Sequence, residues 1–156
     1  MRSRPALRVA LLGGGIIAVT YGLARFVFGL FLPTIRAELG LGTLAAGAIG
    51  ALPFASFVVA ILVAPQVAER LGPRRAAVLA TGLATVGLLA VAGAPGPALL
   101  AVGVATCGLS TGLSSPVMAH AVHRTVPAPL RGRVNAIVNA GTSLGIAAAL
   151  PAILFG

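Results

Sequence analysis

The sequence predicts an all-α protein, a polytopic membrane helix bundle with five transmembrane helices. The prediction rests on overall hydropathy, long uncharged runs and arginine placement. Hydrophobic residues make up 58% of the 156-residue chain and charged residues only 8%, and the mean hydropathy is +1.07. A water-soluble domain carries about a quarter of its residues as charged side chains. Lipid is therefore the solvent expected around most of this chain.

The chain contains apolar stretches long enough to cross a bilayer, which takes about 20 helical residues. One of them, Ala76 to Val122, is long enough for two helices, and the turn-forming segment 94–97 (Ala-Pro-Gly-Pro) divides it. Membrane strands would alternate apolar and polar residues, whereas these stretches are apolar on every side. We expect one domain, residues 1–156, with helices at 9–32, 43–65, 76–93, 98–121 and 134–155.

The start of the chain has arginines followed by an apolar stretch, which is also the pattern of a secretory signal peptide. The stretch continues to Leu32, and no small-residue cleavage site ends it. We interpret it as an uncleaved first helix.

Arginine placement predicts the orientation, because cytoplasmic loops carry an excess of basic residues. With the N-terminus in the cytoplasm, the inner segments hold nine of the eleven basic residues, the outer segments hold Arg36, and Arg25 lies within the first helix. A net charge of +9 on a soluble domain would suggest nucleic acid as a partner. Here the arginines sit between apolar runs, so no nucleic-acid partner is expected. The inner nine are Arg2, Arg4, Arg8, Arg70, Arg74, Arg75, Arg124, Arg131 and Arg133.

The predicted inner loop between the second and third helices reads PQVAERLGPRR from residue 65 to residue 75. Its residues alone describe a short turn with positive-inside arginines. The loop also resembles the major facilitator superfamily signature G-x-x-x-D-R-x-G-R-R-x, although a proline stands at the leading glycine and a glutamate replaces the aspartate. In that family the loop acts as a conformational latch. The resemblance implies this role for Glu69, Arg70, Gly72, Arg74 and Arg75.

Two further segments strengthen the resemblance. The second inner loop, with Arg131, Gly132 and Arg133, resembles the P-x-x-x-R-G-R loop common in the family, and residues 21–33 resemble the first helix of poorly characterised bacterial members. The antiporter signature of the fifth helix is only half present, because Ile146 replaces its proline. No drug/proton antiport is inferred from it.

The resemblance implies the N-terminal part of a secondary transporter: five helices of an incomplete six-helix half that surrounds a midplane site and works by alternating access. It also implies a multi-pass protein of the bacterial inner (plasma) membrane with a cytoplasmic N-terminus. The expected partners are the lipid bilayer, a small-molecule substrate and the remaining helices of a full-length transporter.

Arg25 is the residue most expected to contact substrate, because a charge within a membrane span is costly and usually faces a cavity or a partner. Tyr21 is expected to join Arg25 in the substrate site, because it shares the same helical face, as do Phe28, Gly29 and Leu32. The alternative is that Arg25 extends to the outer interface, about 10 Å of helix away. Asn139 is a second candidate for the cavity. The hydroxyls of Thr111, Ser114 and Ser115 more often join helices than line a path.

No catalytic residue, cofactor or metal site is predicted, and the protein is not expected to be an enzyme. His120 and His123 have no acid or cysteine nearby in sequence, and Cys107 lies alone in an apolar run. A small non-transport membrane subunit or assembly factor remains an alternative to the transporter, since it too could have five helices.

Overall fold

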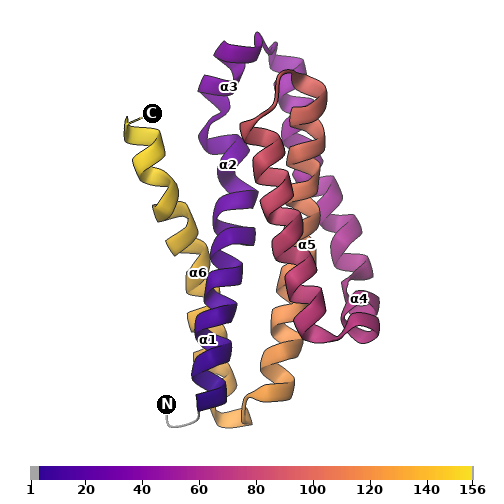
Figure 1. Cartoon of the computed structure of the whole chain (residues 1–156), viewed down its shortest axis with the longest axis vertical. Coiled ribbons are helices and arrows are strands. Elements are labelled where there is room, and N and C mark those ends of the chain that lie inside the picture. Colours follow the sequence, from indigo (N-terminus) through magenta and orange to yellow (C-terminus); the bar gives the residue numbers. More distant parts are fainter. Residues whose placement is uncertain (1–3, 156) are drawn as a thin grey trace.

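The computed structural model describes the backbone of residues 4–155 and the side chains of residues 4–151. Arg2 and Gly156, which belong to predicted segments, lie outside the described residues. Every element in the described part is helical (Figure 1). In chain order, the elements are α1 (Arg4–Ile17), the π-helix η1 (Ala18–Ala24), α2 (Arg25–Leu30), α3 (Leu32–Leu39), α4 (Thr43–Ala92), α5 (Pro97–Thr125) and α6 (Ala128–Phe155).

Among the described residues, four helical stretches are long and apolar enough to cross a membrane, one fewer than predicted. The difference arises in α4, whose 50 residues include the predicted second and third helices. Its backbone departs from helical geometry at Gly72 (φ 76°, ψ 160°), where the chain reverses direction, so that α4 consists of two arms (Figure 1). This conformation is open almost only to glycine, so Gly72 creates the turn that joins the two arms.

The first predicted helix is longer and less regular than expected. It begins at Arg4 rather than near residue 9, and η1 interrupts it with π-helical turns. It continues as α2 to Leu30, after which α3 extends to Leu39. A π-helix pairs each carbonyl with the N–H five residues ahead instead of four, and such turns often accompany functional sites.

Small residues let the helices approach closely. A Cβ atom built on Gly22 of η1 would lie 2.8 Å from the carbonyl oxygen of Thr142, and one built on Gly145 of α6 would collide with the carbonyl oxygen of Ala18. On α5, Gly112 packs in the same way against Phe57 of α4. Glycines at such crossings bring two backbones into contact, which is a common way for helices to associate in lipid.

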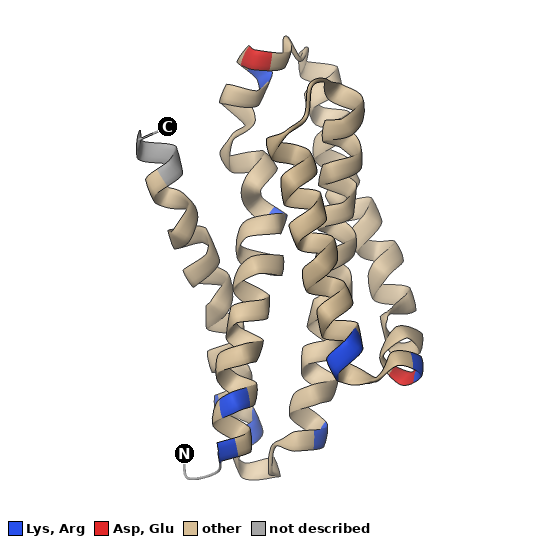
Figure 2. Cartoon of the chain, viewed as in Figure 1, with Lys and Arg blue, Asp and Glu red and all other residues tan. Residues whose placement is uncertain are grey.

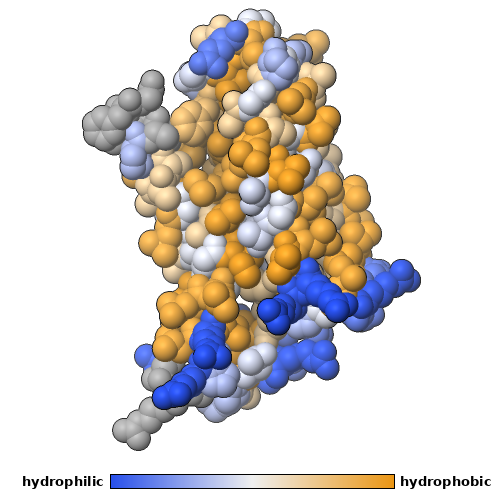
Figure 3. All heavy atoms as spheres, viewed as in Figure 1, coloured by the Kyte–Doolittle hydropathy of each residue, from blue (hydrophilic) through white to orange (hydrophobic). Residues whose placement is uncertain are grey.

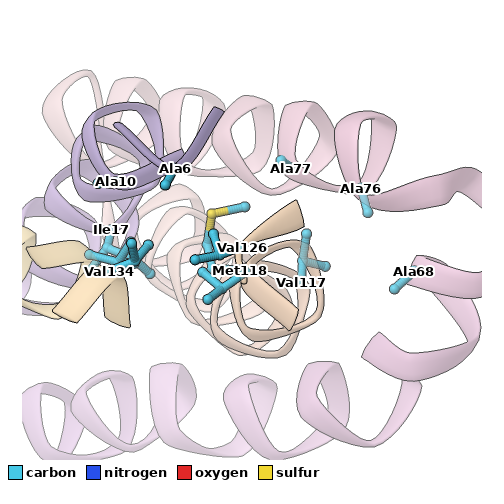
Figure 4. Close-up of a cluster of buried hydrophobic side chains, with 12 residues drawn as sticks. Ala6, Ala10, Ile17, Ala68, Ala76, Ala77, Val117, Met118, Val126 and Val134 are labelled. Atoms are coloured by element: carbon cyan, nitrogen blue, oxygen red, sulfur yellow. The ribbon is translucent and has the colours of Figure 1, made fainter. Parts of the chain in front are cut away.

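The largest buried apolar cluster lies where α1, α5, α6 and both arms of α4 meet (Figure 4). Val117, Val122 and Val134 are almost completely buried there, and alanines such as Ala6 and Ala10 fill the remaining space. The core is therefore built mainly from small side chains, which agrees with the close helix crossings.

The outside of the bundle is apolar along most of its length, with charge at its ends. Figure 2 shows most basic residues at the end that carries the N-terminus, and one basic and one acidic segment at the opposite end. Large side chains such as Leu44, Leu62 and Leu89 are at least two-thirds exposed, and the space-filling view shows an apolar band between the charged regions (Figure 3). The exposed surface is thus suited to lipid.

Candidate functional site

Arg25 lies among three aromatic rings near the start of α2. Its guanidinium carbon is 5.4 Å from the ring centroid of Tyr21, 5.4 Å from that of Phe54 and 5.0 Å from that of Phe57. Tyr21 and Phe57 also meet edge to face, with centroids 6.5 Å apart. We call these three residues the aromatic cradle. Each such cation–π contact is worth about 0.5–2 kcal/mol, more when water is excluded.

A cavity of about 450 Å³ opens beside the half-buried Arg25. Phe28, Gly29 and Leu32, which share a helical face with Arg25 by their spacing, line it from the first helix and its continuation. Pro53 and Phe54 are among the residues that line it from α4. Its size falls within the range of small-molecule sites, which are mostly apolar with few polar groups.

Two arginines line this cavity, but of these two only Arg36 makes side-chain hydrogen bonds among the described residues. Arg36 donates from Nε to the carbonyl oxygen of Leu41 (3.2 Å) and from Nη2 to Oγ1 of Thr43 (3.3 Å), which braces the turn between α3 and α4. Arg25 takes part in none of the side-chain hydrogen bonds found among the described residues. Its contacts there are with the faces of aromatic rings.

A buried hydroxyl cluster lies one turn before Arg25 and joins η1 to α5. Thr20 Oγ1 donates to Ser114 Oγ (3.0 Å), and Thr111 Oγ1 donates to the carbonyl oxygen of Thr20 (2.9 Å). All three residues are fully buried. Thr111 and Ser114 therefore hold two helices together, the role that the sequence favours for them. The cluster fixes the segment that carries Tyr21 and Arg25.

The structure brings Tyr21 and Arg25 together but leaves Asn139 apart from them. Asn139 is exposed on α6 and does not line the cavity beside Arg25. Its neighbour Val138 is the residue of that turn that points into the bundle, against Gly13 of α1.

The predicted latch residues lie around the reversal in α4. Gly72 makes the turn, and the side chains of Glu69, Arg70, Arg74 and Arg75 are exposed around it. Within residues 4–151, no ion pair joins the Glu69 carboxylate to a basic side chain. The loop is thus presented at the arginine-rich end of the bundle without an ionic partner from the described part of the chain.

In the second predicted inner loop, Arg131 closes the end of α5. It donates from Nε to the carbonyl oxygen of Val126 (3.0 Å) and from Nη2 to that of His123 (2.9 Å). The last carbonyls of a helix lack partners within the helix and attract cations. Gly132 and Arg133 are exposed beside it. Arg131 is therefore a structural brace of the loop.

A second cavity of about 690 Å³ lies between α1 and the second arm of α4. Its walls include Leu12, Ile16 and Val78, and Arg8 and Arg74 line it as well. Apart from Arg74, none of the predicted site residues lines it. Elsewhere, no group of three or more potential metal ligands was found in the described part of the chain.

Sequence reasoning missed two members of the aromatic cradle. Phe54 and Phe57 are three residues apart on α4, and nothing in their own helix shows which neighbouring residue they face. The available signal was that both are large aromatic residues in the interior of a predicted helix that neighbours the first helix in the chain. Sequence reasoning also missed η1, because its π-helical turns depend on contacts with other helices.

The fold and the site define a polytopic α-helical membrane protein in which a half-buried arginine lies beside a cavity between the first helical stretch and α4. The Major Facilitator Superfamily profile matches residues 14–155, so the chain belongs to this superfamily. No curated protein and no solved structure matches the chain.

Proposed function

We propose that the chain is the N-terminal part of a secondary transporter that moves a small solute across the bacterial inner membrane by alternating access. The supporting observation is the position of Arg25, which is half-buried at the edge of a cavity without a hydrogen bond from the described protein. A charge kept within a membrane bundle without an acidic partner usually serves a ligand or an ion pathway. Superfamily membership supports transport as the purpose of the site.

In this proposal Arg25 contacts the substrate directly. Tyr21 does not line the cavity, and its ring would contribute to the site by supporting the Arg25 guanidinium. Asn139 would join them only if further helices or a change of conformation brought α6 nearer, since its side chain is exposed on α6. Glu69, Arg70, Arg74 and Arg75 would form the latch with partners on further helices, and Gly72 would keep their loop in its turn. The arginine-rich end would face the cytoplasm.

The test is transport by the complete protein in proteoliposomes, using counterflow of a panel of radiolabelled small solutes. Replacing Arg25 with alanine should lower counterflow at least about tenfold, which corresponds to about 1.4 kcal/mol of lost stabilisation. Arg124→Ala is the matched control, because Arg124 is exposed at the arginine-rich end. Membrane insertion of both variants should equal that of the parent. Normal counterflow by Arg25→Ala would reject the role of this residue.

The superfamily match does not favour a small non-transport subunit or assembly factor. Solute translocation, rather than a covalent reaction, is the chemistry proposed here.

A further inference from the structure

We propose that the cavity beside Arg25 binds an organic monocarboxylate with an apolar body about the size of an aromatic ring, its carboxylate paired edge-on with the Arg25 guanidinium. This inference rests on the proposed function, because it names the substrate class of the same site. It follows from the ring contacts of Arg25 in the aromatic cradle and from the position of the second arginine, Arg36.

The aromatic cradle leaves the hydrogen-bonding capacity of Arg25 unused. A guanidinium has five N–H donors in one plane and no acceptor. The Arg25 carbon lies over the faces of the Tyr21, Phe54 and Phe57 rings. Ring faces attract the positive charge, but they do not replace the paired oxygen acceptors that a guanidinium edge prefers. The N–H donors of the Arg25 guanidinium, which have no acceptor among the described side-chain hydrogen bonds, are therefore available to an oxygen ligand.

A carboxylate fits these donors better than other anions. It presents two oxygens in one plane and forms a bidentate pair with a guanidinium. The second arginine, Arg36, also keeps its charge, but it lies eleven residues further along, about 16 Å of helix from Arg25, and is held in the turn before α4 by its bonds to Leu41 and Thr43. One anionic group bound at Arg25 therefore meets a single guanidinium, which matches the single negative charge of a carboxylate.

The walls of the cavity indicate an apolar body behind the carboxylate. Leu32, Pro53 and Phe54 line it, and the Phe54 side chain is 60% exposed. Gly29, Gly47 and Gly50 also line it, and their lack of side chains leaves room next to these apolar groups. A ring-bearing body would stack on Phe54 and gain both apolar burial and aromatic contact.

A lipid headgroup is the competing source of an anion, because Arg25 is within a few turns of the outer end of its helix. A phospholipid carries a phosphate and long acyl chains, whereas a small aryl carboxylate has neither. An anionic phospholipid would engage Arg25 through a phosphodiester, and it would be displaced by other anionic lipids rather than by small aryl carboxylates.

The test is equilibrium binding of radiolabelled benzoate to the complete protein purified in detergent. Benzamide is the uncharged competitor of the same shape, and benzylamine is the cationic one. We expect benzoate to bind saturably and to be displaced by other aryl carboxylates. Benzamide, benzylamine and inorganic phosphate should compete at least about tenfold less well. Phosphatidylglycerol added to the micelles should leave benzoate binding unchanged.

Two variants locate the binding. Arg25→Lys keeps the charge but loses the planar fork, so benzoate affinity should fall at least about tenfold, whereas Arg124→Lys should change nothing. Phe54→Leu should reduce the preference for benzoate over the short carboxylate propionate, because it removes the exposed ring. This second variant reports on the cavity even if Arg25→Lys is poorly folded, which circular dichroism and gel filtration would reveal.

Failure of this inference is separable from failure of the proposed function. Equal competition by benzoate and benzamide, displacement by phosphatidylglycerol, absence of saturable binding, or full benzoate affinity in a folded Arg25→Lys variant would each overturn the inference. Counterflow of a non-carboxylate solute would leave the transporter proposal standing without it. Conversely, Arg25-dependent benzoate binding together with no counterflow of any solute would support the site and contradict transport.

Discussion

Thr20 and Ser114, 94 positions apart in the chain, meet through their hydroxyl groups at 3.0 Å in the interior of the bundle. Both side chains are fully buried. The carbonyl of Thr20 accepts a further hydrogen bond from Thr111. These bonds fix the π-helical segment that precedes Arg25, and they give the first prediction.

Replacing Thr20 with valine preserves side-chain shape and removes the hydroxyl. Hydrogen bonds between membrane helices average about 0.6 kcal/mol, so we expect a small loss of thermal stability in detergent. Thr85→Val is the control, because its hydroxyl bonds only within its own helix, to the carbonyl oxygen of Thr81, and is exposed. Unchanged Tm in Thr20→Val, measured by circular dichroism, would argue against a stabilising role for the cluster.

The crossing of η1 and α6 gives a larger effect. In Gly22→Ala the new methyl group would lie 2.5 Å from the Cα atom of Gly145, so the two helices must separate. Overpacking of this kind costs about 1–3 kcal/mol, and we expect a clearly lower Tm in detergent. Gly15→Ala on the same helix is the matched control, since a methyl group there meets no atom within 4 Å. The crossing is not tight if both variants melt alike.

The reversal in α4 depends on Gly72, whose φ of 76° and ψ of 160° suit only glycine. We expect Gly72→Ala to cost about 1–3 kcal/mol through backbone strain, although the added methyl group meets no atom within 4 Å. Gly82→Ala, also in α4 and equally free of contacts, should be neutral or stabilising because alanine favours helix. Equal stability of the two variants would mean that the turn tolerates a side chain.

Orientation is testable independently of the site. A reporter fused after Arg74 should indicate a cytoplasmic location, and one fused after Pro95 a periplasmic location, since the arm of α4 between them is long and apolar enough to cross the membrane. The physical reason is the clustering of arginines at one end of the bundle. Activity of the Arg74 fusion in the periplasm would invert the proposed topology.

The sequence predicted the helices well because lipid demands them. A backbone in hydrocarbon must satisfy its own hydrogen bonds, so each long apolar run becomes a helix almost regardless of detail. The turn at residues 94–97 and the reversal near Gly72 could likewise be predicted, because both segments contain proline and glycine. In α6, Gly141 and Gly145 make close contacts with Gly14, Ala18 and Gly22.

The sequence did not predict which faces of neighbouring helices contact one another. Hydropathy says that a helix crosses the membrane, but it does not say which face meets which neighbour. The approach of Phe54 and Phe57 to Arg25 depends on the rotation and depth of two separate helices. The same limit applies to Asn139, whose polar side chain suggested an inward position although the residue is exposed on α6.

The contact of Gly22 with Gly145 has a consequence for how the bundle assembles. Long side chains lose rotational freedom when they are packed, at a cost of up to about 2 kcal/mol each, whereas glycine has none to lose. In lipid, the hydrophobic effect of water does not drive two apolar helices together. A small loss of side-chain conformational entropy on packing therefore matters more there than in the core of a water-soluble protein. The first membrane-spanning stretch and α6 therefore meet at glycines, where packing the two helices costs the least side-chain conformational entropy.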